Sequence, residues 1–265
     1  MNRQIGDDMA DRLFGTDGIR GKVNKGAIRP ANFVRFGEAL ATVLRTKGVA
    51  MPRVLIGRDT RQSGLMIESA ILSGLVNAGA NAELVGILPT PAVGYLTRST
   101  GCDAGLMITA SHNPPTDNGV KVFGADGFKL SSHVQDEIEA LIQSDEELSV
   151  SFEKMGQISS PANSYDDFLA FAKRTVSLSP RWSKLKICLD AAHGAGFKLA
   201  HELLQSTGAT VLASGISPDG ANINVKCGAL HTEALQEAVK SNGADIGIAL
   251  DGDADRLIVV DETGA

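Results

Sequence analysis

Apolar residues in the first half of the chain are grouped in short runs, separated by segments with helical spacing. The runs at 54–59, 82–87 and 103–109 have the length of buried strands. The segments between them, 63–80 and 89–100, place apolar residues three and four positions apart, as an amphipathic helix does. This alternation predicts a parallel sheet with helices on its faces.

The second half of the chain repeats this plan. Strands are predicted at 184–190, from Thr210 and at 243–251, with helices from Phe197 to about Gln205 and over Glu233–Ser241. The segment "GADIGIALD" parallels "GCDAGLMIT" of the first half almost letter for letter. Chance similarity between glycine-rich and alanine-rich segments is the simpler explanation, but five elements in the same order favour a duplicated fold. The predicted class is α/β, with two tandem related domains whose mostly parallel sheets are flanked by helices.

A segment rich in serine, proline and asparagine, "QISSPANSYDD", separates the two halves. This composition is typical of exposed linkers between domains. We therefore predict one domain over residues 1–158 and a second over residues 159–265.

Composition narrows the class of protein. Of the 265 residues, 43% are hydrophobic, 21% are charged and 29 are glycine, a balance typical of α/β enzymes. The net charge of −6 argues against nucleic acid as a partner. Because the chain has neither a signal-like apolar core nor a membrane-length apolar run, we expect no membrane partner and a cytoplasmic location. A homodimer is compatible with the sequence.

The first candidate site is "ITASHNPPTDNGVK" at residues 108–121, a predicted turn directly after a buried strand. A hydrolase nucleophile, a phosphorylated serine and a well-capped turn are the three explanations for its Ser111. A serine hydrolase has glycine two positions before and after its nucleophile, whereas this chain has Thr109 and Asn113.

The second candidate site is "LDGDADRL" at residues 250–257. It places Asp251, Asp253 and Asp255 on one turn, where three hard carboxylate oxygens converge on a cation such as Mg²⁺. An EF-hand also begins D-x-D-x-D, but Arg256 replaces its glycine and both flanks read as strands. A solvated acidic turn is less favourable, because three crowded carboxylates repel each other.

These two sites follow equivalent strands of the two halves. Ligands of open parallel sheets bind at the carboxyl ends of strands, so we expect Ser111 and Asp251 to face one cleft. A phosphorylated Ser111 would then supply a further metal oxygen. Lys121 is predicted to transfer a proton there if neighbouring cations depress its pKa, the alternative being a solvated loop lysine.

Two glycine-rich segments are weaker candidates. "FGTDGIRG" at 14–21 combines a turn with Arg20, which suits a phosphate. "GRDTRQSG" at 57–64, with Arg58 and Arg61, is either a phosphate-facing turn or a capped helix start.

The four segments "FGTDGIRG", "GRDTRQSG", "TASHNPPTDNGVK" and "DGDADR", in this order and spacing, resemble those of the α-D-phosphohexomutases. The resemblance covers essentially the whole chain. Within the family, "DGFKL" and "NINVKCGALH" favour the branch that acts on glucosamine phosphates over the phosphomannomutase/phosphoglucomutase branch.

The resemblance implies a role for each candidate residue. Ser111 is implied to be a phosphoserine, and one Mg²⁺ is held by its phosphate together with Asp251, Asp253 and Asp255. Lys121 is implied to be the general acid/base, beside the catalytic residues His112 and Arg20. Substrate phosphate is implied to contact Arg256, Arg20, Asn113 and Arg58.

The implied substrate is a small sugar phosphate. Ser111 would pass its phosphoryl group to O1 of glucosamine 6-phosphate and recover one from O6 of the resulting 1,6-bisphosphate. Glucosamine or glucose 1,6-bisphosphate would prime the cycle, which supplies precursors of the cell wall.

The family has four domains, and motifs of only the first two occur in this chain. We therefore expect a two-domain portion that does not complete the reaction by itself. The alternative from another class is a non-catalytic module that binds phosphosugars or metal, which would not need Ser111 or Lys121. A phosphatase is less favoured, because no water-activating residue can be assigned.

Overall fold

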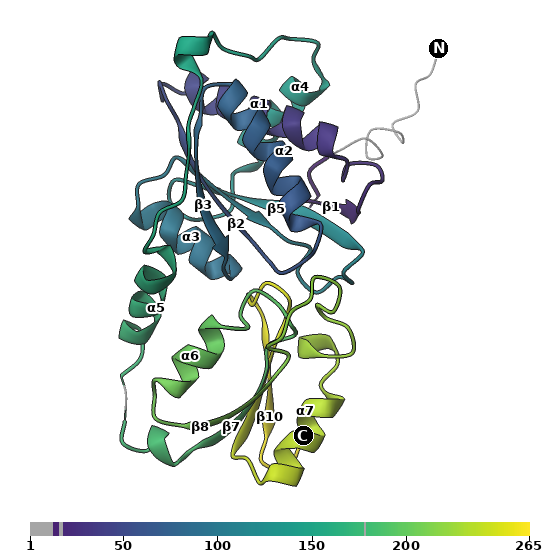
Figure 1. Cartoon of the computed structure of the whole chain (residues 1–265), viewed down its shortest axis with the longest axis vertical. Coiled ribbons are helices and arrows are strands. Elements are labelled where there is room, and N and C mark those ends of the chain that lie inside the picture. Colours follow the sequence, from purple (N-terminus) through teal and green to yellow (C-terminus); the bar gives the residue numbers. More distant parts are fainter. Residues whose placement is uncertain (1–12, 16–17, 178) are drawn as a thin grey trace.

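The computed structural model describes residues 13–15, 18–177 and 179–265, which form two α/β units stacked end to end (Figure 1). The first unit contains β1 (Ile19–Lys22), α1 (Pro30–Thr46), β2 (Arg53–Arg58), α2 (Gly64–Asn77), β3 (Asn81–Ile87), α3 (Thr90–Ser99), β4 (Ala104–Ile108), β5 (Asp117–Gly124), α4 (Ser132–Gln143) and β6 (Ile158–Ser159). The second contains β7 (Lys186–Asp190), α6 (Leu199–Gln205), β8 (Thr210–Ser214), α7 (Glu233–Asn242), β9 (Ile246–Leu250) and β10 (Leu257–Asp261), and α5 (Ser164–Arg174) connects the two.

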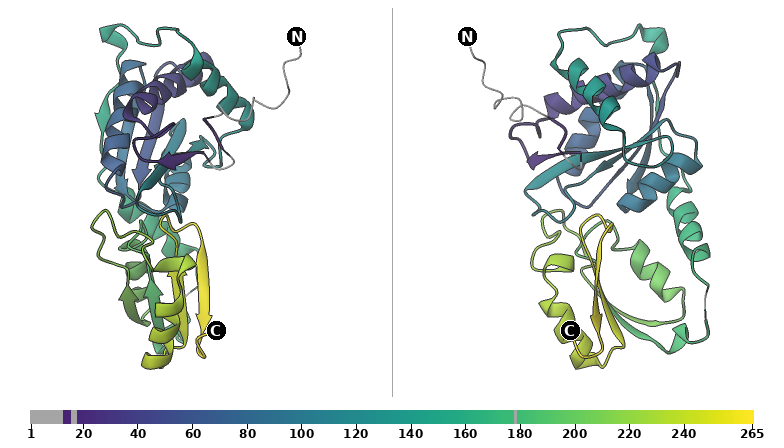
Figure 2. Two further views of the ribbon diagram at one scale, coloured as in Figure 1. Left: turned by 90° about the vertical axis from the view of Figure 1, so that its right-hand side faces the viewer. Right: turned by 180° about the vertical axis from the view of Figure 1, so that it is seen from behind.

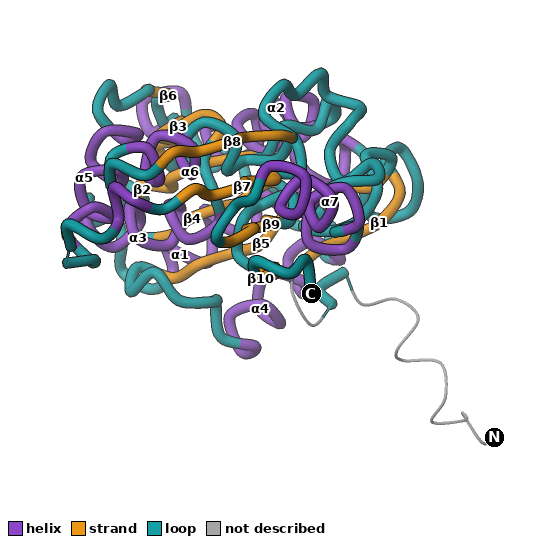
Figure 3. The backbone as a smooth tube through the Cα atoms, turned by 90° about the horizontal axis from the view of Figure 1, so that it is seen from below, coloured by secondary structure: helices purple, strands orange, loops and turns teal. Residues whose placement is uncertain are grey.

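Four neighbouring strands of the first sheet have the same order as the four strands of the second, which agrees with the repeated pattern of the sequence. The first sheet runs β1-β5-β4-β2-β3-β6 and the second runs β10-β9-β7-β8. In each sheet, three neighbouring strands are parallel to one another. The strand that follows them in the sequence pairs antiparallel with the last of the three: β5 pairs with β4, and β10 pairs with β9. Figure 3 shows the two sets of strands in the same succession across the molecule. The prediction of two related α/β units is confirmed.

The first sheet is covered on both faces, which explains its continuous apolar strands. Side chains alternate between the faces of a strand. Val54 and Ile56 accordingly pack in a cluster with α1 and α2, whereas Leu55 packs in a second cluster with α3. Figure 2 shows these helices on opposite sides of the sheet.

The second cluster also joins the two units. It includes Ala195 and Leu199 of the second unit and Phe168 of α5. Phe171 of α5 stacks on Tyr95 of α3 with ring centroids 3.8 Å apart. This apolar and aromatic contact fixes the position of α5 against the first unit.

Some predicted bounds differ from the structure. Residues 117–121 were predicted as part of a turn but form the start of β5. Asn118 and Lys121 of this strand are buried. The helix predicted from Phe197 begins at Leu199. Strand β6 spans the predicted domain boundary near residue 158 and pairs with β3 of the first sheet, which therefore extends to Ser159. The position of the boundary between the domains stays a prediction. Among the described residues, no helix combines the length and apolar character that crossing a bilayer requires.

Candidate active site

The loop after β4 holds Ser111 in a strained backbone conformation. Its φ is +52°, in the left-handed region that costs a non-glycine residue about 1–3 kcal/mol. The residue is buried, and its N–H donates to Thr109 Oγ1 at 2.8 Å. Strain of this kind persists only where the surrounding structure enforces it, which is common at functional sites.

Arg61 enforces this conformation from inside the first unit. Its guanidinium is fully buried, pairs with Asp59 Oδ2 at 2.9 Å and donates to the Ser111 carbonyl at 2.9 Å and the Asn113 carbonyl at 2.8 Å. It also donates to the carbonyl oxygens of Pro114 and Asp117. The "GRDTRQSG" segment therefore supplies an internal brace for the serine loop, a use that the sequence did not indicate.

Asn224 braces the same loop from the second unit. Its Nδ2 donates to the Ser111 carbonyl at 2.8 Å and to the Asn113 carbonyl at 3.1 Å, the two oxygens that Arg61 also contacts. Asn224 itself has a φ of +59°, which asparagine tolerates better than most residues. Both units thus determine where Ser111 lies.

The acidic turn after β9 meets this serine. Ser111 Oγ donates to Asp251 Oδ2 at 2.7 Å, so the expected juxtaposition of the two strand ends is observed. Ligand-capable atoms of Asp251, Asp253 and Asp255 all lie within 4.8 Å of one another. Burial and the neighbouring Asp253 carboxylate raise the pKa of Asp251.

The buried carboxylate of Asp253 is satisfied on one oxygen only. Oδ2 accepts hydrogen bonds from Thr90 Oγ1 at 2.5 Å and Lys121 Nζ at 2.7 Å. Oδ1 is buried and accepts no hydrogen bond from the described part of the chain. A buried carboxylate oxygen without a donor is unfavourable, and carboxylate oxygens are preferred Mg²⁺ ligands. The acidic turn therefore fits a hard divalent cation.

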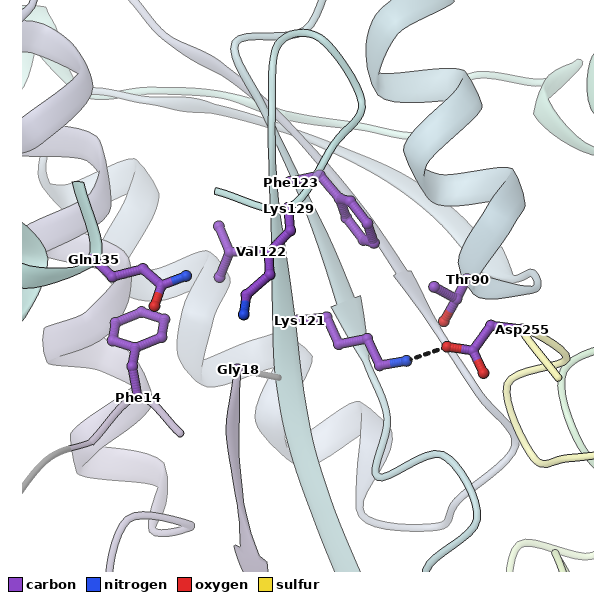
Figure 4. Close-up of a pocket in the computed structure, with 9 residues that line it drawn as sticks. All are labelled: Phe14, Gly18, Thr90, Lys121, Val122, Phe123, Lys129, Gln135 and Asp255. Carbon is purple, nitrogen blue, oxygen red and sulfur yellow. Dashed lines mark hydrogen bonds and ion pairs between the residues drawn. The ribbon is translucent and has the colours of Figure 1, made fainter. Parts of the chain in front are cut away.

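Lys121 reaches this turn from β5. Its Nζ donates to Asp253 Oδ2 at 2.7 Å and to Asp255 Oδ2 at 2.6 Å, and Figure 4 shows the contact with Asp255. Burial alone would lower the pKa of Lys121, but the two carboxylates raise it overall. The expectation that cations around Lys121 depress its pKa is wrong, because its partners are anions.

A pocket lies beside this lysine. It has a volume of about 130 Å³ and is lined by Phe14, Gly18, Thr90, Lys121, Val122, Phe123, Lys129, Gln135 and Asp255 (Figure 4). Gly18 comes from the "FGTDGIRG" segment, whose Thr16 and Asp17 lie outside the described residues. The segment therefore borders the space next to the acidic turn.

Arg256 and His112 complete the surroundings of Ser111. Arg256 Nη2 donates to Ser111 Oγ at 2.6 Å and to Asp251 Oδ2 at 2.9 Å, and it contacts His112 Nδ1. Burial and the nearby charges of Arg256 and Arg20 lower the pKa of His112. Arg20 lies on β1, opposite Gly119 of β5, and its charge thus acts on this site.

Two predicted residues lie in other contacts. Arg58 Nε is 3.5 Å from Glu68 Oε2, a contact with α2 and not with the serine loop. Asn113 Nδ2 donates to Asp117 Oδ2 at 2.9 Å, which closes the loop on itself. Their predicted contacts with a substrate phosphate stay predictions.

Sequence reasoning did not find Thr90 or Asn224. Thr90 follows the strand end at "GILPT", a position at which polar residues often reach a site. Asn224 belongs to "NINVKC", which carried only a family resemblance. Neither segment reveals by itself which residue in the other half of the chain it contacts.

Comparison with known proteins agrees with this arrangement. Residues 11–149 match the family model for phosphoglucomutase/phosphomannomutase alpha/beta/alpha domain I, and residues 165–264 match that for domain II. A phosphoglucosamine mutase of Cereibacter sphaeroides is 46% identical over 260 residues, which are 97% of this chain and 57% of that protein. A phosphoglucosamine mutase of Roseobacter denitrificans is 47% identical over 257 residues, 96% of this chain and 56% of that protein.

A solved structure is similar over the same range. A phosphoglucomutase/phosphomannomutase family protein from Burkholderia thailandensis has a TM-score of 0.81 at 27% identity, covering 96% of this chain and 55% of that chain. The chain thus spans somewhat more than half the length of the relatives it matches. Two matched family domains in tandem, with a serine loop and an acidic turn meeting between them, show that the chain belongs to the phosphoglucomutase/phosphomannomutase family, the α-D-phosphohexomutases.

Proposed function

We propose that this chain carries the phosphoryl-transferring serine and the metal turn of a phosphoglucosamine mutase. The observation that supports this most directly is the position of Ser111 Oγ. It lies 2.7 Å from Asp251 Oδ2 and 2.6 Å from Arg256 Nη2, both of which belong to the second unit. A nucleophile in contact with a carboxylate turn and a guanidinium is suited to phosphoryl transfer, in which positioning and charge stabilisation provide most of the catalysis.

The proposed reaction passes one phosphoryl group back and forth. In the first half, the Ser111 Oγ–P bond breaks and a bond from phosphorus to O1 of glucosamine 6-phosphate forms. In the second half, the O6–P bond of the 1,6-bisphosphate breaks and the Oγ–P bond forms again. Glucosamine 1-phosphate leaves, and Ser111 is phosphorylated as at the start.

Asp251, Asp253 and Asp255, together with the Ser111 phosphate, are the proposed ligands of one Mg²⁺. When bound, the ion neutralises negative charge on the transferred group. Arg256, which contacts Ser111 Oγ, would donate a hydrogen bond to an oxygen of the same group. His112, whose pKa is lowered by burial and by the charge of Arg256, lies beside it.

Lys121 is the proposed group that exchanges protons with the sugar oxygens. In the first half of the reaction, Lys121 as the neutral amine would take the proton of O1, and in the second half its ammonium would return that proton to O6. Asp253 and Asp255 stabilise the ammonium form of Lys121, which is the form that gives a proton. The pocket beside Lys121 offers space next to that proton.

The proposed sugar follows from the relatives at 46% and 47% identity, which are named phosphoglucosamine mutases. A mutase acting on mannose or glucose phosphates is the second candidate, because a putative phosphomannomutase of Thermus thermophilus has a TM-score of 0.82 at 25% identity. A cytoplasmic location, a homodimer and the absence of nucleic-acid and membrane partners stay predictions.

Phosphoryl transfer to the purified chain tests the proposal. The chain, freed of phosphate, is incubated with Mg²⁺ and glucose 1,6-bisphosphate, and its intact mass is followed with time. We expect the gain of one phosphoryl group, mapped to Ser111 by fragmentation. A chain that binds Mg²⁺ but never gains this mass would be a non-catalytic binding module.

Asp253→Ala is expected to abolish Mg²⁺ binding while the chain stays folded. The substitution removes one of three converging carboxylates and leaves too few oxygens for the ion. Calorimetric titration with MgCl₂ measures the effect, and urea unfolding checks the fold. The control is Glu237→Ala, which removes an exposed carboxylate from α7. Unchanged Mg²⁺ affinity in Asp253→Ala would remove the acidic turn as the metal site.

A further inference from the structure

Thr90 contacts the acidic turn from the other unit through two of its atoms. It is the first residue of α3, and its backbone N–H donates to the Asp253 carbonyl at 2.9 Å. Its side-chain Oγ1 donates to Asp253 Oδ2 at 2.5 Å. One residue of the first unit therefore holds both the main chain and the carboxylate of Asp253.

These contacts decide which oxygen of Asp253 faces the centre of the turn. Oδ2 receives both Thr90 Oγ1 and Lys121 Nζ, so rotation of the carboxylate would break two charge-assisted hydrogen bonds. Oδ1 is buried and accepts no hydrogen bond from any described residue. Because Thr90 and Lys121 hold Oδ2, Oδ1 is the oxygen of Asp253 that remains for a cation.

The position of Thr90 at a helix start adds to this effect. The first N–H groups of a helix have no partner within the helix, and one of them here holds the metal turn. The positive end of the α3 dipole also favours a carboxylate at this place. Thr90 is itself buried, and low exposure strengthens the hydrogen bond from its hydroxyl to the carboxylate.

We propose that Thr90 is a positioning residue for the metal site, which fixes Asp253 so that Oδ1 is presented to the cation. The inference rests on the proposed Mg²⁺ site. It assigns to a helix of the first unit a part in cation binding by the second unit, so that the site is complete only when both units are docked. Partners that orient metal ligands typically contribute 10-fold to 100-fold to affinity.

The test compares Mg²⁺ affinity in variants that separate the hydroxyl from the shape of Thr90. Thr90→Val keeps the branched shape and removes the donor, and we expect Mg²⁺ to bind about 10-fold or more weakly. Thr90→Ser keeps the donor, and we expect affinity within about threefold of the original chain. Calorimetric titration with MgCl₂ gives the affinities, and urea unfolding shows that each variant is folded.

Thr97→Val is the matched control. Thr97 is a buried threonine of the same helix, and its hydroxyl donates to the Val93 carbonyl at 2.7 Å. Its replacement is expected to leave Mg²⁺ affinity unchanged. If Thr90→Val does not fold, Thr90→Ala provides the same comparison with Thr90→Ser.

Three results would overturn the proposal: original affinity in Thr90→Val, an equal loss in Thr90→Ser, or an equal loss in Thr97→Val. Failure of the original chain to bind Mg²⁺ would instead contradict the metal site itself. The two failures are therefore distinguishable.

Discussion

Ser111→Ala is expected to abolish phosphoryl transfer to the chain while leaving its fold intact. The substitution removes the hydroxyl that contacts both Asp251 of the acidic turn and Arg256. The loop itself should persist, because Arg61 and Asn224 hold it through the Ser111 carbonyl and not through Oγ. Loss of a nucleophile removes the covalent step entirely, whereas loss of a binding contact weakens it.

The measurement is intact mass after incubation with Mg²⁺ and glucose 1,6-bisphosphate, with urea unfolding as the check of folding. Ser73→Ala is the control, because Ser73 is an exposed serine of α2 whose hydroxyl bonds only locally, to the Ser69 carbonyl. We expect this control to gain one phosphoryl group. Equal phosphorylation of Ser111→Ala would place the acceptor elsewhere in the chain.

Arg61→Ala is expected to lower the free energy of unfolding by about 3–5 kcal/mol, the usual cost of breaking a buried ion pair from one side. The Asp59 carboxylate would remain buried without its cation, and four carbonyl oxygens of the serine loop would lose a donor. Because the same loop carries a left-handed Ser111, its conformation should relax as well.

Urea unfolding followed by circular dichroism measures this loss. Arg61→Lys should recover only part of the stability, since an ammonium cannot serve the planar set of acceptors that a guanidinium does. Arg98→Ala, at an exposed position of α3, is expected to change stability by no more than about 0.5 kcal/mol. An Arg61→Ala chain as stable as the Arg98→Ala chain would show that the brace is dispensable.

The sequence determined the secondary structure best where both faces of a strand are buried. Residues 54–56 and 106–108 are apolar without interruption, because α1 and α2 cover one face of the sheet and α3 covers the other. The start of strand β5 was not predicted as a strand, because Asn118 and Lys121 interrupt its run of apolar residues. Those polar residues can be buried because Ser63, at the start of α2, and Asp253, in the second unit, supply partners for them.

The two candidate sites were also visible in the sequence, because their residues are neighbours along the chain. Three aspartates alternate along one turn, so their carboxylates lie close together, and Ser111 comes shortly after the end of β4. The repeated strand order then placed both sites at equivalent sheet edges. Local chemistry and periodicity are sufficient for such predictions.

Only the tertiary structure decided how these groups are held and charged. Arg61 braces a loop 50 residues away, Lys121 meets a carboxylate 132 residues away, and Thr90 orients one 163 residues away. The pKa of Lys121 is raised and not lowered, because its neighbours are the carboxylates of Asp253 and Asp255, which the second unit supplies. Contacts between distant residues depend on how buried surfaces dock, and no local pattern encodes which donor meets which acceptor there.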